Sequence, residues 1–215
     1  MSSDMLKLYE SSTSPNSRRV RIFLAEKGIC ASRVPVDLGA KEQFSDAYVR
    51  INPRRVVPTL VIEDGTAIGE VPAILRYLEE THPNAPLLGS TAKEKALVTM
   101  WERRMELEGF AVVMETVRNK VAGLKGRAIA GPHDYEQIPA LVERGFQRLA
   151  NFYADLEARL KEAAFVAGER FSVADITAIV AIDFATKALD LPIPEANPAT
   201  QRWYAQVAAR PSFSA

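Results

Sequence analysis

Cysteine and histidine are the scarcest chemistry-bearing residues of this 215-residue chain, which has one cysteine and two histidines. A lone Cys30 excludes an internal disulfide framework and fits a reducing compartment. Cys30 with His82 and His133 gives no zinc-ligand spacing, so we expect no metal. Because Cys30 follows Gly28 instead of lying in a strand-to-helix turn, we expect a buried structural thiol there.

The chain also lacks an excess of charge of one sign and long apolar runs. The 27 basic and 27 acidic side chains cancel, so no overall field points to nucleic acid or an anionic membrane as a partner. No run approaches the roughly 20 apolar residues of a membrane span, and residues 1–4 do not form a signal peptide. We therefore expect a soluble cytoplasmic protein, with most residues of its arginine pairs 18–19, 54–55 and 103–104 solvated.

Strand and helix signals alternate over the first eighty residues. Ser14, Asn16 and Ser17 can cap a helix that ends near Gly28, and Asp64-Gly65 is a hairpin turn. The periodicity predicts strands at 5–9, 29–36, 57–63 and 66–68, and helices after Ser14, at 44–49 and at 73–80. This βαβαββα order predicts a thioredoxin-like domain at residues 1–83.

Beyond a connector at residues 84–91, the pattern becomes purely helical. Ser172 and Asp175 have the spacing of a capping box before an apolar helix. Two apolar stripes recur at steps of three and four, at 110, 114, 117, 121 and 124 and at 142, 146, 149, 153, 156 and 160. The fold class is therefore α+β, with an all-α bundle at residues 92–215.

Three segments of the first domain carry a family resemblance. They are Ser14-Pro15-Asn16-Ser17, Val56-Val57-Pro58-Thr59-Leu60 and Glu70-Val71-Pro72-Ala73-Ile74. Together they resemble the N-terminal half of a cytosolic glutathione transferase, and the resemblance runs from about Met5 to Ser212. It implies that the turn meets the glutathione sulfur, that a cis Val57–Pro58 bond presents the Val57 backbone to the cysteinyl part, and that Glu70 meets the γ-glutamyl amine.

The resemblance assigns the catalytic role to Ser14, with Asn16 as a second donor. The run from Ser14 to Ile22 matches the register of the serine classes theta and zeta, and it also looks like the Thr-Pro-Asn turn of Nu and other bacterial classes. Ser14 and Asn16 are equally suited to capping the helix and nothing more. Ser11, Ser12 and Thr13 lie close enough to replace Ser14, and Tyr9 resembles the donor of the tyrosine classes.

The remaining contacts to glutathione depart in part from the family pattern. Val57, Pro58 and Glu70 match it, whereas Val71 stands where the family usually has a Ser or Thr, so only its N–H remains for the γ-glutamyl carboxylate. Val56 replaces a polar residue. Arg55 and Lys41 are the candidates for the glycine carboxylate, with a weaker signal at Gln43.

Two functions follow from this reading. The first is a glutathione transferase that presents a hydroxyl-stabilised glutathione thiolate, as co-substrate, to a small hydrophobic electrophile. The alternative is a non-catalytic interaction or regulatory protein on the same fold that binds glutathione weakly or not at all. The resemblance also implies a homodimer, with each active cleft bordering the partner's helical domain.

Overall fold

A computed structural model describes residues 6–214 of the chain. Two compact units are present in it. The first comprises the residues up to Ala85 together with Ala130–His133 and Ser214, and the second comprises Pro86–Ile129 and Asp134–Phe213. No helix among residues 6–214 is both long and apolar enough to traverse a bilayer. The predicted connector at residues 84–91 stays a prediction.

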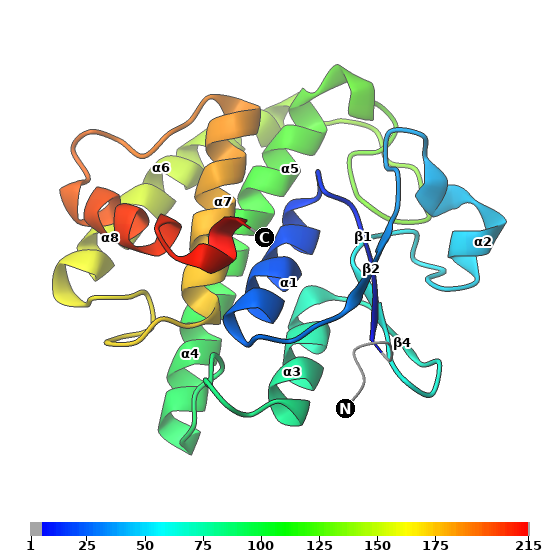
Figure 1. The fold of residues 1–215 in the computed structure, drawn as a ribbon. Helices are drawn as coiled ribbons and strands as arrows, with labels where there is room; N and C mark the ends of the chain where they lie inside the picture. The colour runs from blue at the N-terminus through cyan, green and yellow to red at the C-terminus, as the bar shows by residue number, and fades with distance from the viewer. Residues whose placement is uncertain (1–5, 215) are drawn as a thin grey trace. The chain divides into compact units, whose positions relative to one another are not determined.

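A mixed four-stranded sheet forms the centre of the first unit. Its strands are β1 (Lys7–Glu10), β2 (Ser32–Pro35), β3 (Thr59–Val61) and β4 (Ala67–Ile68). They lie in the order β2-β1-β3-β4, with β1 parallel to β2 and the other pairs antiparallel. Helices α1 (Pro15–Glu26) and α3 (Val71–Thr81) lie on one side of the sheet in Figure 1, and α2 (Asp46–Val49) lies on the other. The predicted βαβαββα thioredoxin-like order is confirmed.

Local chemistry sets the start and end of α1. Ser14 is its N-cap and Pro15 occupies the first turn, where a missing N–H is tolerated. Val20 and Phe23 on this helix are fully buried. Gly28 follows the helix with φ of +63°, a conformation that a glycine adopts without steric cost.

Several predicted boundaries in this unit differ from the structure. The second strand is shorter than predicted and begins at Ser32, whereas α3 begins at Val71, two residues earlier than predicted. The helix predicted at 44–49 is divided into a 3₁₀ turn (Glu42–Phe44) and α2. Ser45 causes this division because its extended backbone interrupts the turn and its hydroxyl caps α2 by accepting from the Tyr48 N–H. Met5, where the first strand was predicted to begin, lies outside the described residues.

The second unit is helical throughout. Its helices are α4 (Ala92–Arg104), α5 (Ala111–Lys120), α6 (Pro139–Glu162), α7 (Val173–Leu189) and α8 (Pro198–Ala208). A π-helical segment, Met105–Phe110, joins α4 to α5, and 3₁₀ turns lie at Ala122–Leu124 and Pro211–Ser214. The predicted stripe at 142–160 lies within α6, and the capping box of Ser172 and Asp175 begins α7.

The first predicted stripe ends earlier than its sequence pattern indicates. Val121 has ψ of 118°, which is extended backbone, and its side chain is 38% exposed. Gln137 explains the end of the helix, since its Nε2 donates to the carbonyl oxygens of Arg118 and Val121 at 2.8 Å each. These carbonyls lack partners within the last turn of a helix, so a side-chain donor stabilises the end there.

Candidate functional site

The turn before α1 arranges several hydroxyls around a helix N-terminus. The Ser14 Oγ accepts from the Ser17 N–H at 3.2 Å, and the Ser14 N–H donates to the Ser11 carbonyl at 3.0 Å. The Ser17 Oγ in turn accepts from the Ser11 N–H at 3.2 Å. A hydroxyl has one proton to donate besides its lone pairs. Ser14 therefore caps the helix and still keeps a proton with which it can donate to an anion.

Asn16 is held by a neighbour on the same helix. Its Oδ1 accepts from the Arg19 Nη1 at 3.3 Å, and Arg19 is itself 1% exposed, against the expectation of solvated arginines. Within residues 6–214, the Asn16 amide nitrogen makes no hydrogen bond. The arrangement leaves two N–H donors of Asn16 at the positive end of α1.

The alternative donors in this turn differ in exposure and in partners. Ser11 is buried, and its Oγ lies 3.2 Å from the Thr13 Oγ1. Ser12 and Thr13 are exposed. Tyr9 lies inside β1, with its ring 6.2 Å from that of Tyr48. The candidate donors Ser11 to Asn16 therefore lie together in the segment before and at the start of α1, whereas Tyr9 lies in the preceding strand.

The Val57–Pro58 peptide bond is cis, as predicted. Two hydrogen bonds hold the carbonyl of the preceding Val56 in place. It accepts from the Tyr48 hydroxyl at 2.6 Å and from the Asn52 Nδ2 at 3.1 Å. Burial raises the pKa of Tyr48, which keeps this hydroxyl protonated as a donor. No hydrogen bond between described residues engages the Val57 N–H or carbonyl. This backbone pair is open to a bound peptide.

Two buried polar atoms without partners lie in the segment that leads to this loop. The Gln43 side chain is 3% exposed, and its Oε1 has no hydrogen-bond partner in the described part of the chain. The same holds for the Nε of Arg55, whose guanidinium lies 5.6 Å from the Phe44 ring centroid. Lys41 is exposed. The burial of Gln43, with its unused acceptor, is a feature that the sequence alone does not show.

Glu70 and Val71 form the N-terminal end of α3. Glu70 has φ of +62°, uncommon for a residue with a side chain, and its own side chain is exposed and does not cap the helix. Its carbonyl instead accepts from the N–H groups of Ala73 and Ile74. Val71 is 4% exposed, so its side chain packs in the core of the unit. The glutathione contacts that the sequence assigns to these two residues remain predictions.

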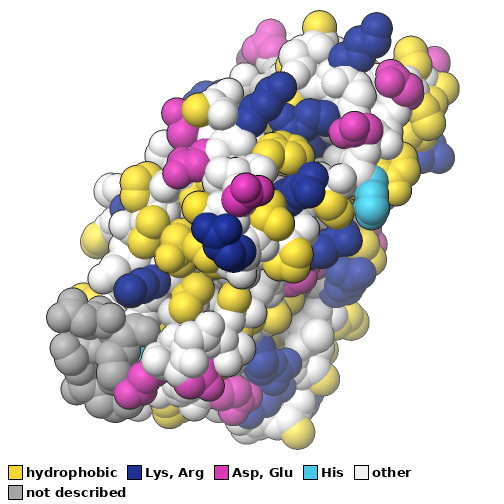
Figure 2. All heavy atoms as spheres, turned by 90° about the vertical axis from the view of Figure 1, so that its right-hand side faces the viewer, with side chains coloured by type: hydrophobic (Ala, Val, Ile, Leu, Met, Phe, Trp, Pro, Cys, Tyr) yellow, Lys and Arg dark blue, Asp and Glu magenta, His cyan; other side chains and the backbone are white. Residues whose placement is uncertain are grey.

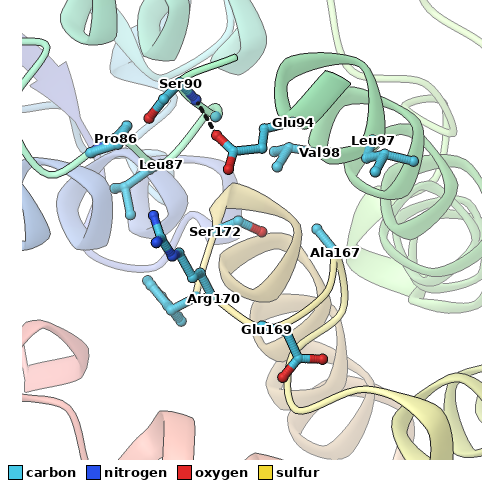
Figure 3. Close-up of a pocket in the computed structure, with 12 residues that line it drawn as sticks. Pro86, Leu87, Ser90, Glu94, Leu97, Val98, Ala167, Glu169, Arg170 and Ser172 are labelled. Atoms are coloured by element: carbon cyan, nitrogen blue, oxygen red, sulfur yellow. Dashed lines mark hydrogen bonds between the residues drawn. The ribbon is translucent and has the colours of Figure 1, made fainter. Parts of the chain in front are cut away.

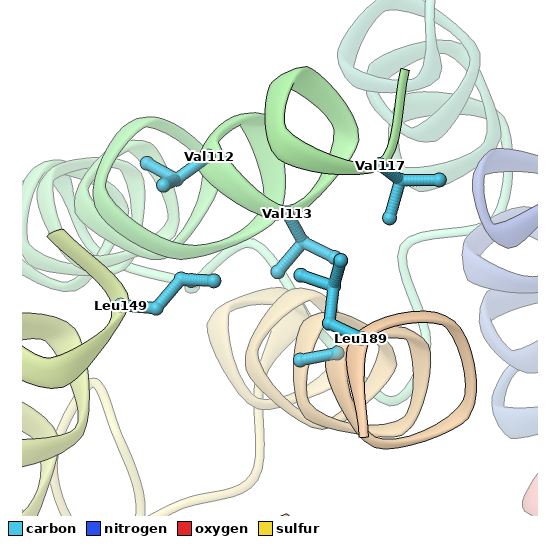
Figure 4. Close-up of a cluster of buried hydrophobic side chains, with 6 residues drawn as sticks. Val112, Val113, Val117, Leu149 and Leu189 are labelled. Carbon is cyan, nitrogen blue, oxygen red and sulfur yellow. The ribbon is translucent and has the colours of Figure 1, made fainter. Parts of the chain in front are cut away.

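The expectation of a buried cysteine is wrong. Cys30 is exposed, not buried, because it lies after the positive-φ turn at Gly28 and before β2 begins. Val112 and Val113 of α5 are 0% and 1% exposed. Figure 4 shows them in a cluster between helices with Val117, Leu149, Ala185 and Leu189. They form helical core.

A pocket of about 280 Å³ lies within the helical unit, between the start of α4 and the segment before α7 (Figure 3). The Glu94 carboxylate and the Arg170 guanidinium both line it, and Glu94 accepts from the N–H groups of Ser90 and Thr91 at 2.9 and 3.2 Å. On the molecular surface drawn in Figure 2, basic and acidic side chains are interspersed. None of the predicted site residues lines this pocket.

Comparison with known proteins bears on the whole chain. Residues 13–81 match the family model described as the glutathione S-transferase N-terminal domain, and residues 139–206 match that of the C-terminal domain. Glutathione S-transferase 2 of Saccharomyces cerevisiae is 31% identical over 95% of this chain and 86% of its own length. The chain belongs to the glutathione S-transferase family.

Solved structures and shorter matches agree with this assignment. A glutathione S-transferase domain-containing protein of Marinobacter aquaeolei superposes with a TM-score of 0.88 at 34% identity, covering 96% of this chain and 99% of that one. Maleylacetoacetate isomerase of Rattus norvegicus is 45% identical over 43% of this chain and 44% of its own length. The predicted fold class is confirmed, and these names support the prediction of a glutathione transferase enzyme.

Proposed function

We propose that this protein is a glutathione transferase that stabilises the glutathione thiolate with the Ser14 hydroxyl and presents it to a hydrophobic electrophile. The observation that carries the proposal is the Ser14 Oγ, which caps α1 by accepting from Ser17 and keeps its own proton at the N-terminus of that helix. Family membership supplies the fold and glutathione as co-substrate.

The energetics of one donor are sufficient for this chemistry. A thiol with a pKa of about 8.5 is only a few per cent ionised at neutral pH. A hydrogen bond to a charged group contributes roughly 1.5–3 kcal/mol. At about 1.36 kcal/mol per pKa unit, Ser14 would lower the thiol pKa by roughly one to two units. The positive end of α1 and the free amide protons of Asn16 favour the anion further.

Glutathione would contact the turn before α1, the loop at Val57–Pro58 and the start of α3. We assign the cysteinyl backbone to the open N–H and carbonyl of Val57, the γ-glutamyl amine to Glu70 and its carboxylate to the Val71 N–H. Arg55 and Lys41 would hold the glycine carboxylate. The unpaired Oε1 of Gln43 is an acceptor, so it would take a peptide N–H of glutathione and not the carboxylate. Pro58 shapes the loop, and no step of the reaction requires a metal.

Retention on immobilised glutathione, with elution by free glutathione, tests the binding step. Spectroscopic titration of the bound thiolate then tests the role of Ser14. Retention with a lowered thiol pKa is the expected result. No retention and no binding by calorimetry would favour the alternative, a non-catalytic interaction protein, for which the apolar Val56 and Val71 are the argument.

We also propose a homodimer in the cytoplasm, with residues 1–83 as the glutathione-binding domain, 84–91 as linker and 92–215 as the helical domain. The exposed apolar side chains Leu97 and Met100 on α4 support an interface between two copies. The reaction type is found by assaying conjugation, isomerisation and peroxide reduction side by side, since all three use the same thiolate.

A further inference from the structure

The pocket of about 280 Å³ in the helical unit carries two charged groups whose bonding capacity is not used up (Figure 3). Within residues 6–214, the Arg170 guanidinium makes no hydrogen bond and no ion pair. Glu94 accepts from the N–H groups of Ser90 and Thr91 through Oε2 alone, and its Oε1 accepts from no described residue. Several N–H donors and one acceptor oxygen are therefore available in this pocket.

The two charges face the same gap but form no ion pair across it. The hydrogen bonds from Ser90 and Thr91, and then the positive charge of Arg170, lower the pKa of Glu94, so this side chain is a carboxylate at neutral pH. Figure 3 shows the Glu94 carboxylate and the Arg170 guanidinium on opposite sides of the gap, with the Glu169 carboxylate pointing away from it. A ligand between them would meet one charge of each sign.

The walls of the pocket between these charges are mostly apolar. They include Leu87, Val98, Ala167 and Phe171. Leu87 and Val98 are 5% and 8% exposed, so they are part of the packed structure and not loose surface side chains. Apolar walls with a few polar groups at defined places are typical of small-molecule sites. This lining matches a ligand that has an apolar body and charges of both signs.

Hydrogen bonding and close backbone packing hold these walls in place. The Val173 N–H donates to the Leu87 carbonyl at 3.1 Å, which ties the segment before α4 to the start of α7. Gly89 has φ of +88°, and a Cβ atom there would lie 2.6 Å from the backbone nitrogen of Lys95. The Gly89 backbone therefore lies directly against the first turn of α4. A site that is ordered before binding loses less conformational entropy when the ligand enters.

We propose that this pocket binds a free apolar α-amino acid, with its carboxylate on the Arg170 guanidinium, its ammonium on the Glu94 Oε1 and its side chain against Val98 and Phe171. An arginine presents two parallel N–H donors that match the two oxygens of a carboxylate. A ligand with a single charge would leave one pocket charge unpaired, whereas the zwitterion pairs both.

The volume of the pocket sets the size of the amino acid. A water molecule occupies about 30 Å³ of liquid, so about 280 Å³ holds a ligand with on the order of ten non-hydrogen atoms, the size of leucine. Glutathione carries the same headgroup, but it has roughly twice as many non-hydrogen atoms as the pocket can hold, and its body is polar. The inference is therefore independent of the proposed glutathione site.

Calorimetry with leucine and two analogues that each lack one charge tests the headgroup contacts. The analogue 4-methylpentanoate lacks the ammonium, and 3-methylbutylamine lacks the carboxylate. We expect the wild type to bind leucine tenfold or more tightly than either analogue, the ratio that one charged hydrogen bond supplies. Equal affinity for the three probes, or no binding of leucine at millimolar concentration, overturns the proposal.

Two variants should each remove one of these preferences. Glu94→Gln keeps a side chain that suits the capping box of α4 but removes the charge, so it should lose most of the preference for leucine over 4-methylpentanoate. Arg170→Gln should lose most of the preference for leucine over 3-methylbutylamine. Arg103→Gln removes an exposed arginine from the other end of α4 and should keep both. Unchanged preferences in the first two variants, or an equal loss in Arg103→Gln, contradict the assignment.

Thermal unfolding separates ligand binding from a structural role of Arg170. Because its guanidinium has no partner among the described residues, Arg170→Gln without ligand should melt at the wild-type temperature. Leucine should raise the melting temperature of the wild type and of Arg103→Gln but not that of Arg170→Gln. Serine, with the same headgroup and a small polar side chain, should raise it less. An unliganded Arg170→Gln that melts several degrees lower would show that the guanidinium serves the fold, which overturns the proposal.

Discussion

At the scale of single residues, Ser14 combines two roles that a substitution can separate. Its oxygen caps α1, and its proton remains for the glutathione sulfur. Ser14→Asp keeps a good capping acceptor but brings no proton. We expect it to fold as stably as the wild type and to raise the thiol pKa of bound glutathione by more than the one to two units of the lost hydrogen bond, because its carboxylate also repels the sulfur anion, as seen by absorbance titration of the thiolate.

Ser14→Ala removes both roles, so it should also lose about 1 kcal/mol of stability to urea. Ser12→Ala, an exposed serine in the same turn, is the matched control and should change neither quantity. If Ser14→Asp and Ser14→Ala leave the thiol pKa as it was while Asn16→Ala or Ser11→Ala raises it, the donor is assigned to the wrong residue.

Val71 provides a second prediction at this scale. Val71→Thr keeps the branched shape and adds the hydroxyl that the family usually has at the start of α3. We expect calorimetry to show glutathione binding several-fold tighter, because the hydroxyl can donate to the γ-glutamyl carboxylate. Because Val71 is 4% exposed, a buried hydroxyl should also cost about 1–3 kcal/mol in the free protein.

The two effects of Val71→Thr have separate measurements. Urea unfolding without glutathione reports the cost, and calorimetry of the folded variant reports the gain. Unchanged affinity in a folded, less stable variant would mean that the γ-glutamyl carboxylate lies away from the start of α3.

The sequence predicts the structural role of a residue when that role is set by its neighbours along the chain. The Ser14 cap follows from neighbouring residues, the cis bond before Pro58 follows from the family resemblance, and both were predicted. The exposure of Cys30 depends on packing between distant segments, and it was mispredicted. The unpaired Oε1 of Gln43 and Nε of Arg118 appear only once every neighbour is placed.

At the scale of elements, the start of α7 shows how much a short motif determines. Asp175 is fully buried and accepts from the N–H of Val166, the N–H and hydroxyl of Ser172 and the indole N–H of Trp203, at 2.8 to 3.1 Å. The capping box was predicted because it lies within four residues. The bonds to Val166 and Trp203, from distant parts of the chain, were not predictable from it.

This carboxyl makes stability depend on pH. Burial raises the pKa of Asp175 to about 6, although its hydrogen bonds lower it. Since this is above the unfolded value of about 3.9, the folded protein binds the proton more readily. The contribution of Asp175 is therefore complete below about pH 4 and is lost as pH rises through 6, by about 3 kcal/mol for two pKa units.

Urea unfolding of the wild type and of Asp175→Asn, each at pH 4 and pH 7, measures this contribution. Asparagine does not titrate, and the other titrating groups cancel when the two proteins are compared at each pH. The stability advantage of the wild type over the variant should be smaller at pH 7 than at pH 4. An advantage that grows with pH would show that Asp175 is ionised throughout and that its hydrogen bonds outweigh burial.

At the scale of the whole molecule, the residues proposed for the activity belong to one unit. The thiolate donors and the open Val57 backbone lie in the first unit. The sequence predicted both architectures because each has its own periodicity, alternating in the first and helical in the second. The surface on which two copies would meet has no comparable pattern, and its prediction rests on family resemblance and exposure.

Met100 provides the test of the homodimer. It is 46% exposed on α4, three residues after the 39% exposed Leu97, so the two side chains share a helix face. A stable interface buries on the order of 1,000 Å² or more and excludes charges from its centre. Met100→Glu should therefore sediment as a monomer at micromolar concentration, where the wild type sediments as a dimer.

Gln147→Glu adds the same charge at an exposed site on α6 and should remain dimeric. A wild type that sediments as a monomer contradicts the homodimer itself, whereas a dimeric Met100→Glu would place the interface away from this face of α4.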